Sequence, residues 1–125
     1  MPPMAEFKLK GVSIVMLGVT DLEKSTAFYV EKLGLRATGQ IPGFSFLDGG
    51  GVSLALSEPL ARASKQVVGA TEVIFGVDSV REAHRELKER GVTFLNEPRC
   101  VDGVSWAVDF SDPDGHVLSV FGPEG

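Results

Sequence analysis

The stretch GVTDLEKS at residues 18–25 decides the fold, because a similar stretch, GVDSVREA, recurs at residues 76–83. A second pair follows the same plan, since DGGGVSLA at residues 48–55 matches DPDGHVLS at residues 112–119. Internal repetition of this kind indicates one structural unit used twice. Two such units can enclose a cavity that neither encloses alone, so the repeat bears on function as well as on fold.

The first half predicts a strand, a helix and three further strands. Apolar residues run almost without interruption from residue 11 to residue 18, as in a buried strand. Thr20 or Asp21 can then cap a helix that ends at Gly34. Turn residues separate the short strands that follow, which we expect at residues 36–40, 43–47 and 52–57.

The second half repeats this order. A strand at residues 72–77 leads to a helix that Asp78 or Ser79 caps and Gly91 ends. Three short strands follow, and we expect them at residues 93–95, 104–110 and 117–121.

The repeated plan predicts an α+β fold in a single domain spanning residues 1–125. The first βαβββ module covers about residues 10–57 and the second about residues 71–123, with a linker at residues 58–70. We expect the modules to pair into a cupped eight-stranded sheet around a cavity, with the helices on the outside.

Charge and composition exclude several classes of function. The formal net charge is −5 and no run of Lys or Arg occurs, so no nucleic-acid partner is expected. No apolar run is long enough to span a bilayer, so no membrane partner is expected either. Cys100 is the only cysteine, which excludes an internal disulfide and an all-thiolate metal site. The N-terminal residues lack the features of a signal peptide, so a cytoplasmic location is expected.

Two motifs carry a resemblance to a known family. Residues 19–29 read VTDLEKSTAFY, and residues 112–116 read DPDGH. Together with the duplication, they resemble the vicinal oxygen chelate superfamily, which includes glyoxalase I, bleomycin resistance proteins and extradiol dioxygenases. The resemblance covers about residues 10–123. It implies the paired-module fold, a small molecule as ligand and a homodimer.

The resemblance also implies four positions at which enzymes of the family bind a divalent metal. Counted from the motifs of each half, these positions hold Ile14, Ala55, Glu72 and Ser119. Alkyl side chains donate nothing to a metal, and one carboxylate with one hydroxyl is too few ligands. We therefore expect no metal and no other cofactor.

Three other residues could in principle act as ligands or nucleophiles. His84 is expected in the second helix and His116 directly after a turn, and neither falls on a cavity position. Cys100 has no histidine in an obvious arrangement with it, so a buried or half-buried thiol is expected.

Strand alternation predicts which side chains line the cavity. These side chains are mostly apolar with a few polar ones, as in a typical small-molecule site. The aromatic residues could stack on an aromatic or cationic ligand, or they could fill the core. The predicted ligand-binding residues are Ile14, Met16, Phe44, Phe46, Ala55, Glu72, Ile74, Trp106, Ser119 and Phe121.

Glu72 leaves two alternatives open. Inside the cavity, its carboxylate would be desolvated and would need a partner, such as a ligand ammonium or the Ser119 hydroxyl. At the frayed start of its strand, it would instead be solvated and without a role.

Two main classes of function remain. The first is a metal-independent binding protein that takes an apolar or cationic small molecule. The second is an enzyme, either a metal-dependent lyase, isomerase or dioxygenase with a non-standard site or a metal-free one with Glu72 as base. A weaker third option is an interaction module with a vestigial cavity. The missing metal ligands favour the binding protein, and the sequence assigns no established catalytic residue.

Overall fold

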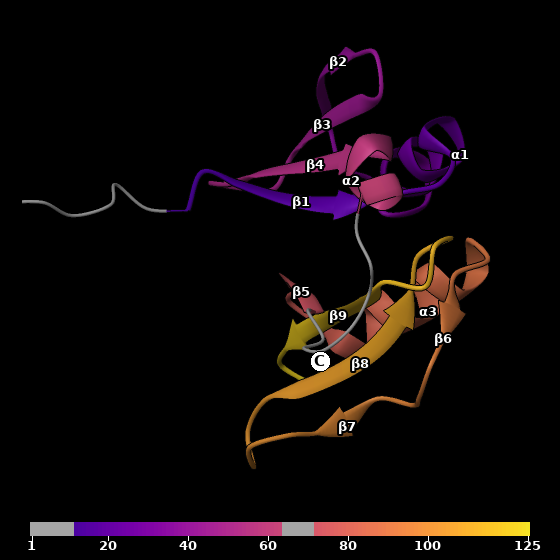
Figure 1. The fold of residues 1–125 in the computed structure, drawn as a ribbon. Coiled ribbons are helices and arrows are strands. Elements are labelled where there is room, and N and C mark those ends of the chain that lie inside the picture. The colour runs from indigo at the N-terminus through magenta and orange to yellow at the C-terminus, as the bar shows by residue number, and fades with distance from the viewer. Residues whose placement is uncertain (1–11, 64–71) are drawn as a thin grey trace, which may run out of the picture.

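The computed structural model describes residues 12–63 and 72–125, which form two similar halves (Figure 1). The start of the first module and most of the predicted linker lie outside these residues. The first half contains β1 (Ile14–Gly18), α1 (Leu22–Ala27), the π-helical η2 (Phe28–Lys32), β2 (Ala37–Ile41), β3 (Phe44–Asp48), β4 (Ser53–Ser57) and α2 (Glu58–Ala63). The second contains β5 (Glu72–Gly76), α3 (Val80–Glu89), β6 (Thr93–Phe94), β7 (Arg99–Cys100), β8 (Trp106–Ser111) and β9 (Val117–Gly122).

The two halves share one strand topology. The first sheet has the order β1-β4-β3-β2, with β1 parallel to β4 and the other pairs antiparallel. The second has the order β5-β9-β8-β6, with β5 parallel to β9, and the short β7 also pairs with β8. The predicted α+β class and the two βαβββ modules are thereby confirmed. The strands hydrogen-bond as a four-stranded and a five-stranded sheet, and β7 is the strand that the sequence pattern did not predict.

Side-chain caps begin the helices α1 and α3 at the predicted places. Asp21 accepts a hydrogen bond at 3.0 Å, and Ser79 accepts one at 3.1 Å, each from a backbone N–H three residues further on. Of the alternatives that the sequence left open, the structure therefore selects Asp21 and Ser79. Gly34 and Gly91 follow the helices with φ of 77° and 84°, a conformation that favours glycine.

The helices cover one face of each sheet, and the core lies between helices and strands. Alternate strand residues such as Leu54, Leu56, Phe110 and Leu118 are almost fully buried there. Within residues 12–63 and 72–125, none of the helices has the length and apolar character needed to cross a membrane.

The DPDG turn between β8 and β9 makes a buried contact with the first half of the chain. The hydroxyl of Tyr29, on η2, donates a hydrogen bond to Asp112 at 2.8 Å, and the Tyr29 side chain is fully buried. The other oxygen of Asp112 accepts from the backbone N–H groups of Asp114 and His116. One carboxylate therefore both closes the turn and binds the other module.

The same turn also holds the start of α1. Asp114 accepts hydrogen bonds from the backbone N–H and hydroxyl of Thr20 and from the hydroxyl of Ser25. Nε2 of His116 lies 2.6 Å from the carbonyl oxygen of Gly18. Figure 1 shows this turn reaching toward α1. The DPDG motif therefore forms a contact between the modules as well as a turn.

We expect Tyr29 to make the stability of the protein fall at alkaline pH. Burial, together with the neighbouring carboxylates of Asp112 and Asp114, raises the pKa of Tyr29 far above its usual value. A group whose pKa is higher in the folded state than in the unfolded chain stabilises the folded state fully below its unfolded pKa, which for tyrosine is about 10. This stabilisation is lost progressively as the pH rises above that value. The free energy of unfolding should therefore decrease by about 1.4 kcal/mol per pH unit above that point because of this residue.

Denaturant unfolding of the wild type and of Tyr29→Phe, measured from neutral to alkaline pH, checks this expectation. The variant should be less stable at neutral pH but should lack this part of the alkaline decline. Tyr29 is the only tyrosine, so its ionisation is visible in the absorbance of the folded protein. A folded-state transition near the ordinary tyrosine pKa would contradict the structure.

Candidate functional site

Each sheet has a face that the helices do not cover, which we call its open face. On β4, Leu54 and Leu56 pack into the core, so Ser53 and Ala55 lie on the open face. On β5, Val73 packs against the core, whereas Glu72 and Ile74 are exposed on the other side. The strand registers extend the same assignment to the neighbouring strands.

Most of the predicted ligand-binding residues lie on these open faces. Phe44 and Phe46 are neighbours on β3, with parallel rings whose centroids are 6.4 Å apart. Ala55 pairs with Phe46 on one side and with Met16 on the other, and it is fully buried. The open face of the first sheet holds Ile14, Met16, Phe44, Phe46 and Ala55, and that of the second holds Glu72, Ile74, Ser119 and Phe121.

Trp106 is the exception among the predicted ligand-binding residues. It alternates with Ala107 on β8 and shares the helix-side face with Val108, where it packs against the core. The guanidinium of Arg81, on α3, lies 5.4 Å from its ring centroid. The placement of Trp106 beside the ligand site is therefore corrected. The sequence alone could not assign the facing of this short strand.

The four positions implied for a metal do not form a metal site. Ile14 and Ala55 carry no donor atom, and Glu72 is exposed at the start of β5. The hydroxyl of Ser119 is buried and directed to two backbone carbonyls, at 3.3 and 3.4 Å. Among residues 12–63 and 72–125, no three His, Cys, Asp or Glu side chains lie together as metal ligands would. This donor set does not fit a resident divalent ion.

The other candidate ligands are engaged elsewhere or stand apart. His84 packs edge-on against Phe94 with the ring centroids 4.5 Å apart, and it lies 3.9 Å from Glu97. His116 belongs to the contact between the modules. Cys100, on β7, is exposed, which corrects the expectation of a buried or half-buried thiol.

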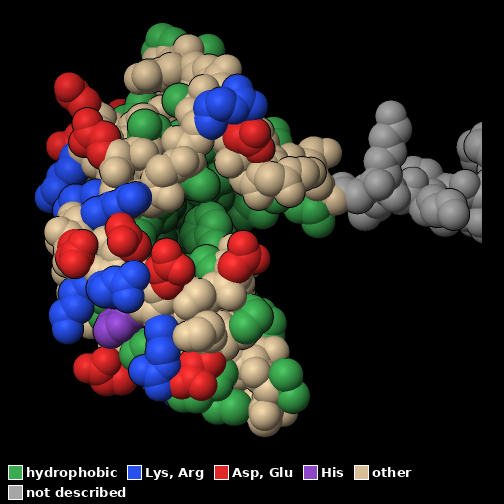
Figure 2. All heavy atoms as spheres, turned by 180° about the vertical axis from the view of Figure 1, so that it is seen from behind, with side chains coloured by type: hydrophobic (Ala, Val, Ile, Leu, Met, Phe, Trp, Pro, Cys, Tyr) green, Lys and Arg blue, Asp and Glu red, His purple; other side chains and the backbone are tan. Residues whose placement is uncertain are grey.

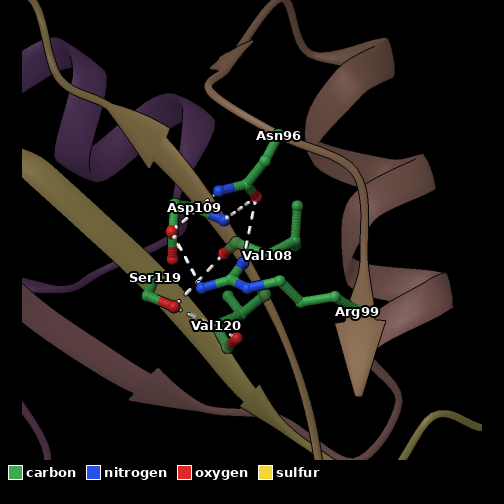
Figure 3. A network of polar contacts seen from close by, with 6 residues as sticks. All are labelled: Asn96, Arg99, Val108, Asp109, Ser119 and Val120. Carbon is green, nitrogen blue, oxygen red and sulfur yellow. Dashed lines mark hydrogen bonds and ion pairs between the residues drawn. The ribbon is translucent and has the colours of Figure 1, made fainter. Parts of the chain in front are cut away.

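A polar network on the second open face was not predicted (Figure 3). Arg99 lies 3.1 Å from a carboxylate oxygen of Asp109 and donates to the side-chain oxygen of Asn96 at 3.2 Å. Asn96 in turn donates to the same carboxylate oxygen at 2.8 Å. A signal for it was present in the sequence, because Asp109 interrupts an otherwise apolar strand. The partner Arg99 could not be found, because β7 is too short to give a pattern.

The carboxylate of Asp109 is charged although it is largely buried. Burial by itself raises the pKa of Asp109, but the hydrogen bond from Asn96 and the charge and hydrogen bond of Arg99 together bring that pKa below its usual value. Its second oxygen, Oδ1, is buried and receives no hydrogen bond that meets normal geometry within the described residues. The network therefore keeps an ion pair fixed on the open face.

A cavity of about 280 Å³ lies on the helix side, between the two halves. Figure 2 shows hydrophobic side chains at the bottom of a hollow there, with charged side chains along one side. Leu33 and Leu35 of the first half line it together with Phe75 and Leu87 of the second, beside Glu86 and Arg90. None of the predicted ligand-binding residues lines this cavity, and its volume is small for a drug-sized ligand, which needs about 300–1,000 Å³.

The paired βαβββ modules and their two open faces define a class of proteins that share one fold and carry various sites on it. The family model described as Glyoxalase/Bleomycin resistance protein/Dioxygenase superfamily matches residues 11–120. The chain therefore belongs to this superfamily, and the predicted resemblance is confirmed.

Known relatives agree with this membership. The uncharacterized protein YurT of Bacillus subtilis is 28% identical over an alignment 123 residues long, which covers 87% of this chain and 96% of YurT. The crystal structure of TnmS3, an antibiotic binding protein from a Streptomyces species, is similar with a TM-score of 0.79 and 26% identity, covering 94% of this chain and 99% of that one. Lactoylglutathione lyase from Agrobacterium tumefaciens has a TM-score of 0.76 and 21% identity, over 93% of this chain and 96% of its own. At that identity, the likeness to the lyase concerns the fold alone.

Proposed function

We propose that the protein binds a small molecule on its open faces without the help of a metal. The observation that carries this proposal is the set of mostly apolar lining residues on those faces, with Ile14 and Ala55 at two of the four positions implied for a metal. An apolar ligand suits the stacked rings of Phe44 and Phe46 and the exposed side chain of Ile74. A cationic ligand is the further possibility, supported by the net charge of −5 and by Glu72.

The likeness to TnmS3 supports a binding role, because that relative is described as an antibiotic binding protein and covers nearly the whole chain. The enzyme alternative, a metal-dependent lyase, isomerase or dioxygenase, finds less support. Ile14 and Ala55 offer no ligand atoms, and Glu72 is exposed rather than held beside a second acid or base.

We also propose that two copies of the chain associate in a cytoplasmic setting, with the open faces taking part. Val12, Ile14, Met16, Ile74 and Phe121 are large apolar side chains that are 39–73% exposed in the single chain. Exposed apolar side chains gathered on the sheet faces favour an interaction surface. The elution and light scattering of the purified protein give its molecular mass directly. A monomer at high concentration would contradict this part of the proposal.

The binding role is tested by a thermal-shift screen of neutral, cationic and anionic aromatic compounds, followed by calorimetry of the hits. We expect at least one compound to raise the Tm, and Ile74→Asp to weaken its binding by roughly tenfold or more because a charge then lies on the apolar face. Val104→Asp is the matched control, because Val104 is also apolar and exposed but lies on the loop before β8.

Metal analysis of protein purified without a chelator separates the two classes of function. We expect less than a stoichiometric amount of any transition metal, and we expect ligand binding that is unchanged by a chelator. A tightly held metal in stoichiometric amount would favour the enzyme instead.

A further inference from the structure

The network of Asn96, Arg99 and Asp109 has a geometry that suits recognition of a ligand oxygen. Arg99 pairs with Ala107 across β7 and β8, and Ala107 pairs with Phe121, so all three lie on the open face of the second sheet. The side chain of Arg99 is 46% exposed, whereas that of Asp109 is 16% exposed. The carboxylate thus lies under the guanidinium, and the guanidinium lies toward solvent.

Arg99 keeps donors available after it has bound its two partners. A guanidinium carries five N–H donors in a rigid planar fork. One of these contacts Asn96 and another contacts Asp109, and both contacts hold the plane of the group in place. A guanidinium held in this way is preorganised to bind an oxygen of a second molecule, because little side-chain entropy remains to be lost.

The surroundings of Arg99 supply the apolar part of a site. Phe121 lies one strand away from Ala107, and Ile74 lies on β5 beside Ser119, and both are exposed. Ser119, at a position where metal-binding relatives would hold a ligand, pairs directly with Asp109. The fixed guanidinium therefore lies on the same face as these exposed apolar side chains.

We infer that Arg99, held in place by Asp109 and Asn96, binds an anionic oxygen of the ligand, so that the ligand is an apolar molecule with a carboxylate, phenolate or enolate group. The inference rests on the proposed binding function and narrows its ligand class. It decides against the cationic ligand, because the half-exposed guanidinium of Arg99 already places a positive charge of the protein on this face. Arg99 contacts the ligand, and Asp109 and Asn96 are positioning residues.

Calorimetry with three probes of one shape tests the inference: naphthoate, the neutral naphthamide and naphthylmethylammonium. We expect naphthoate to bind about tenfold or more tightly than the other two, as for a charge-assisted hydrogen bond. Arg99→Gln should abolish this preference, because the guanidinium is removed, and Arg99→Lys should keep part of it. Asn96→Ala leaves the charge of the site unchanged but should reduce the preference, because Asn96 positions Arg99. If Asn96 had only a structural role, the preference would not change.

Two further variants keep the test decisive. Arg99→Gln leaves the carboxylate of Asp109 without its cation, so the double variant Arg99→Gln/Asp109→Asn, which removes both charges, is measured beside it and should also lack the preference. Arg36→Gln is the matched control, because Arg36 makes an ion pair with Asp48 at 3.0 Å in the first half, and it should retain the preference. Equal affinities for the three probes, or a preference for the ammonium, would overturn the inference and leave the binding function standing. Failure of every probe and of the whole aromatic screen would overturn both.

Discussion

Asp112→Ala is expected to lower the free energy of unfolding by about 3 kcal/mol or more, with a fall in Tm of roughly 10 °C. The substitution removes the acceptor of the buried Tyr29 hydroxyl and the acceptor of two backbone N–H groups in the DPDG turn at once. A buried donor that loses its partner costs more than the hydrogen bond contributed, because water cannot replace the partner. Chemical denaturation followed by the fluorescence of Trp106, the only tryptophan, measures the loss.

Asp102→Ala is the matched control for this prediction. Asp102 also accepts hydrogen bonds from two backbone N–H groups in a turn, but it is exposed and contacts the loop alone. Its removal should cost only a small part of what Asp112→Ala costs, because water replaces the lost acceptor. Equal losses in the two variants would mean that the contact between the modules contributes nothing measurable.

Gly122→Ala is expected to destabilise the protein by about 3 kcal/mol. A Cβ atom at this position would overlap the backbone carbonyl oxygen of Val77, which follows β5. Backbone cannot move aside as the end of a flexible side chain can, and here it is fixed by a hydrogen bond from Val77 N–H to the carbonyl of Phe121 at 3.0 Å. The parallel pairing of β5 and β9 would have to shift at its end.

Gly76→Ala provides the comparison for this second variant. Gly76 lies on β5 opposite Phe121, and a Cβ atom there would meet nothing within 4 Å. We expect Gly76→Ala to be neutral or slightly stabilising, because alanine restricts the unfolded chain more than glycine does. Thermal unfolding of both variants under one set of conditions gives the difference. A Gly122→Ala protein as stable as Gly76→Ala would show that the end of β9 is not constrained as described.

Periodicity and repetition were sufficient to predict the fold. The alternation around Leu54 and the caps at Asp21 and Ser79 are local properties of the sequence, and each can be recognised without knowing the rest of the chain. The two-residue β7 could not be predicted in this way, because it exists only through its pairing with β8.

The candidate site was predicted in part, for a related reason. The places of Ile14, Phe46 and Ile74 on the open faces follow from strand alternation, which assigns a face once the strand is known. Trp106 does not, because the predicted strand began before the observed one and the facing of its first residues was open. The pairing of Arg99 with Asp109 depends on the path of the chain between β6 and β8, which no local pattern encodes.

Different parts of the chain bind the N-termini of α1 and α3. At α1 this is Asp114 of the DPDG turn, whereas at α3 the hydroxyl of Ser79 donates to the carbonyl of Glu124 near the C-terminus. In a symmetric pair of identical units, each such bond would occur twice. The duplicated chain has thus lost its internal two-fold symmetry at these points. Natural variation should therefore be rare at residues 112–115, because that turn contacts both modules.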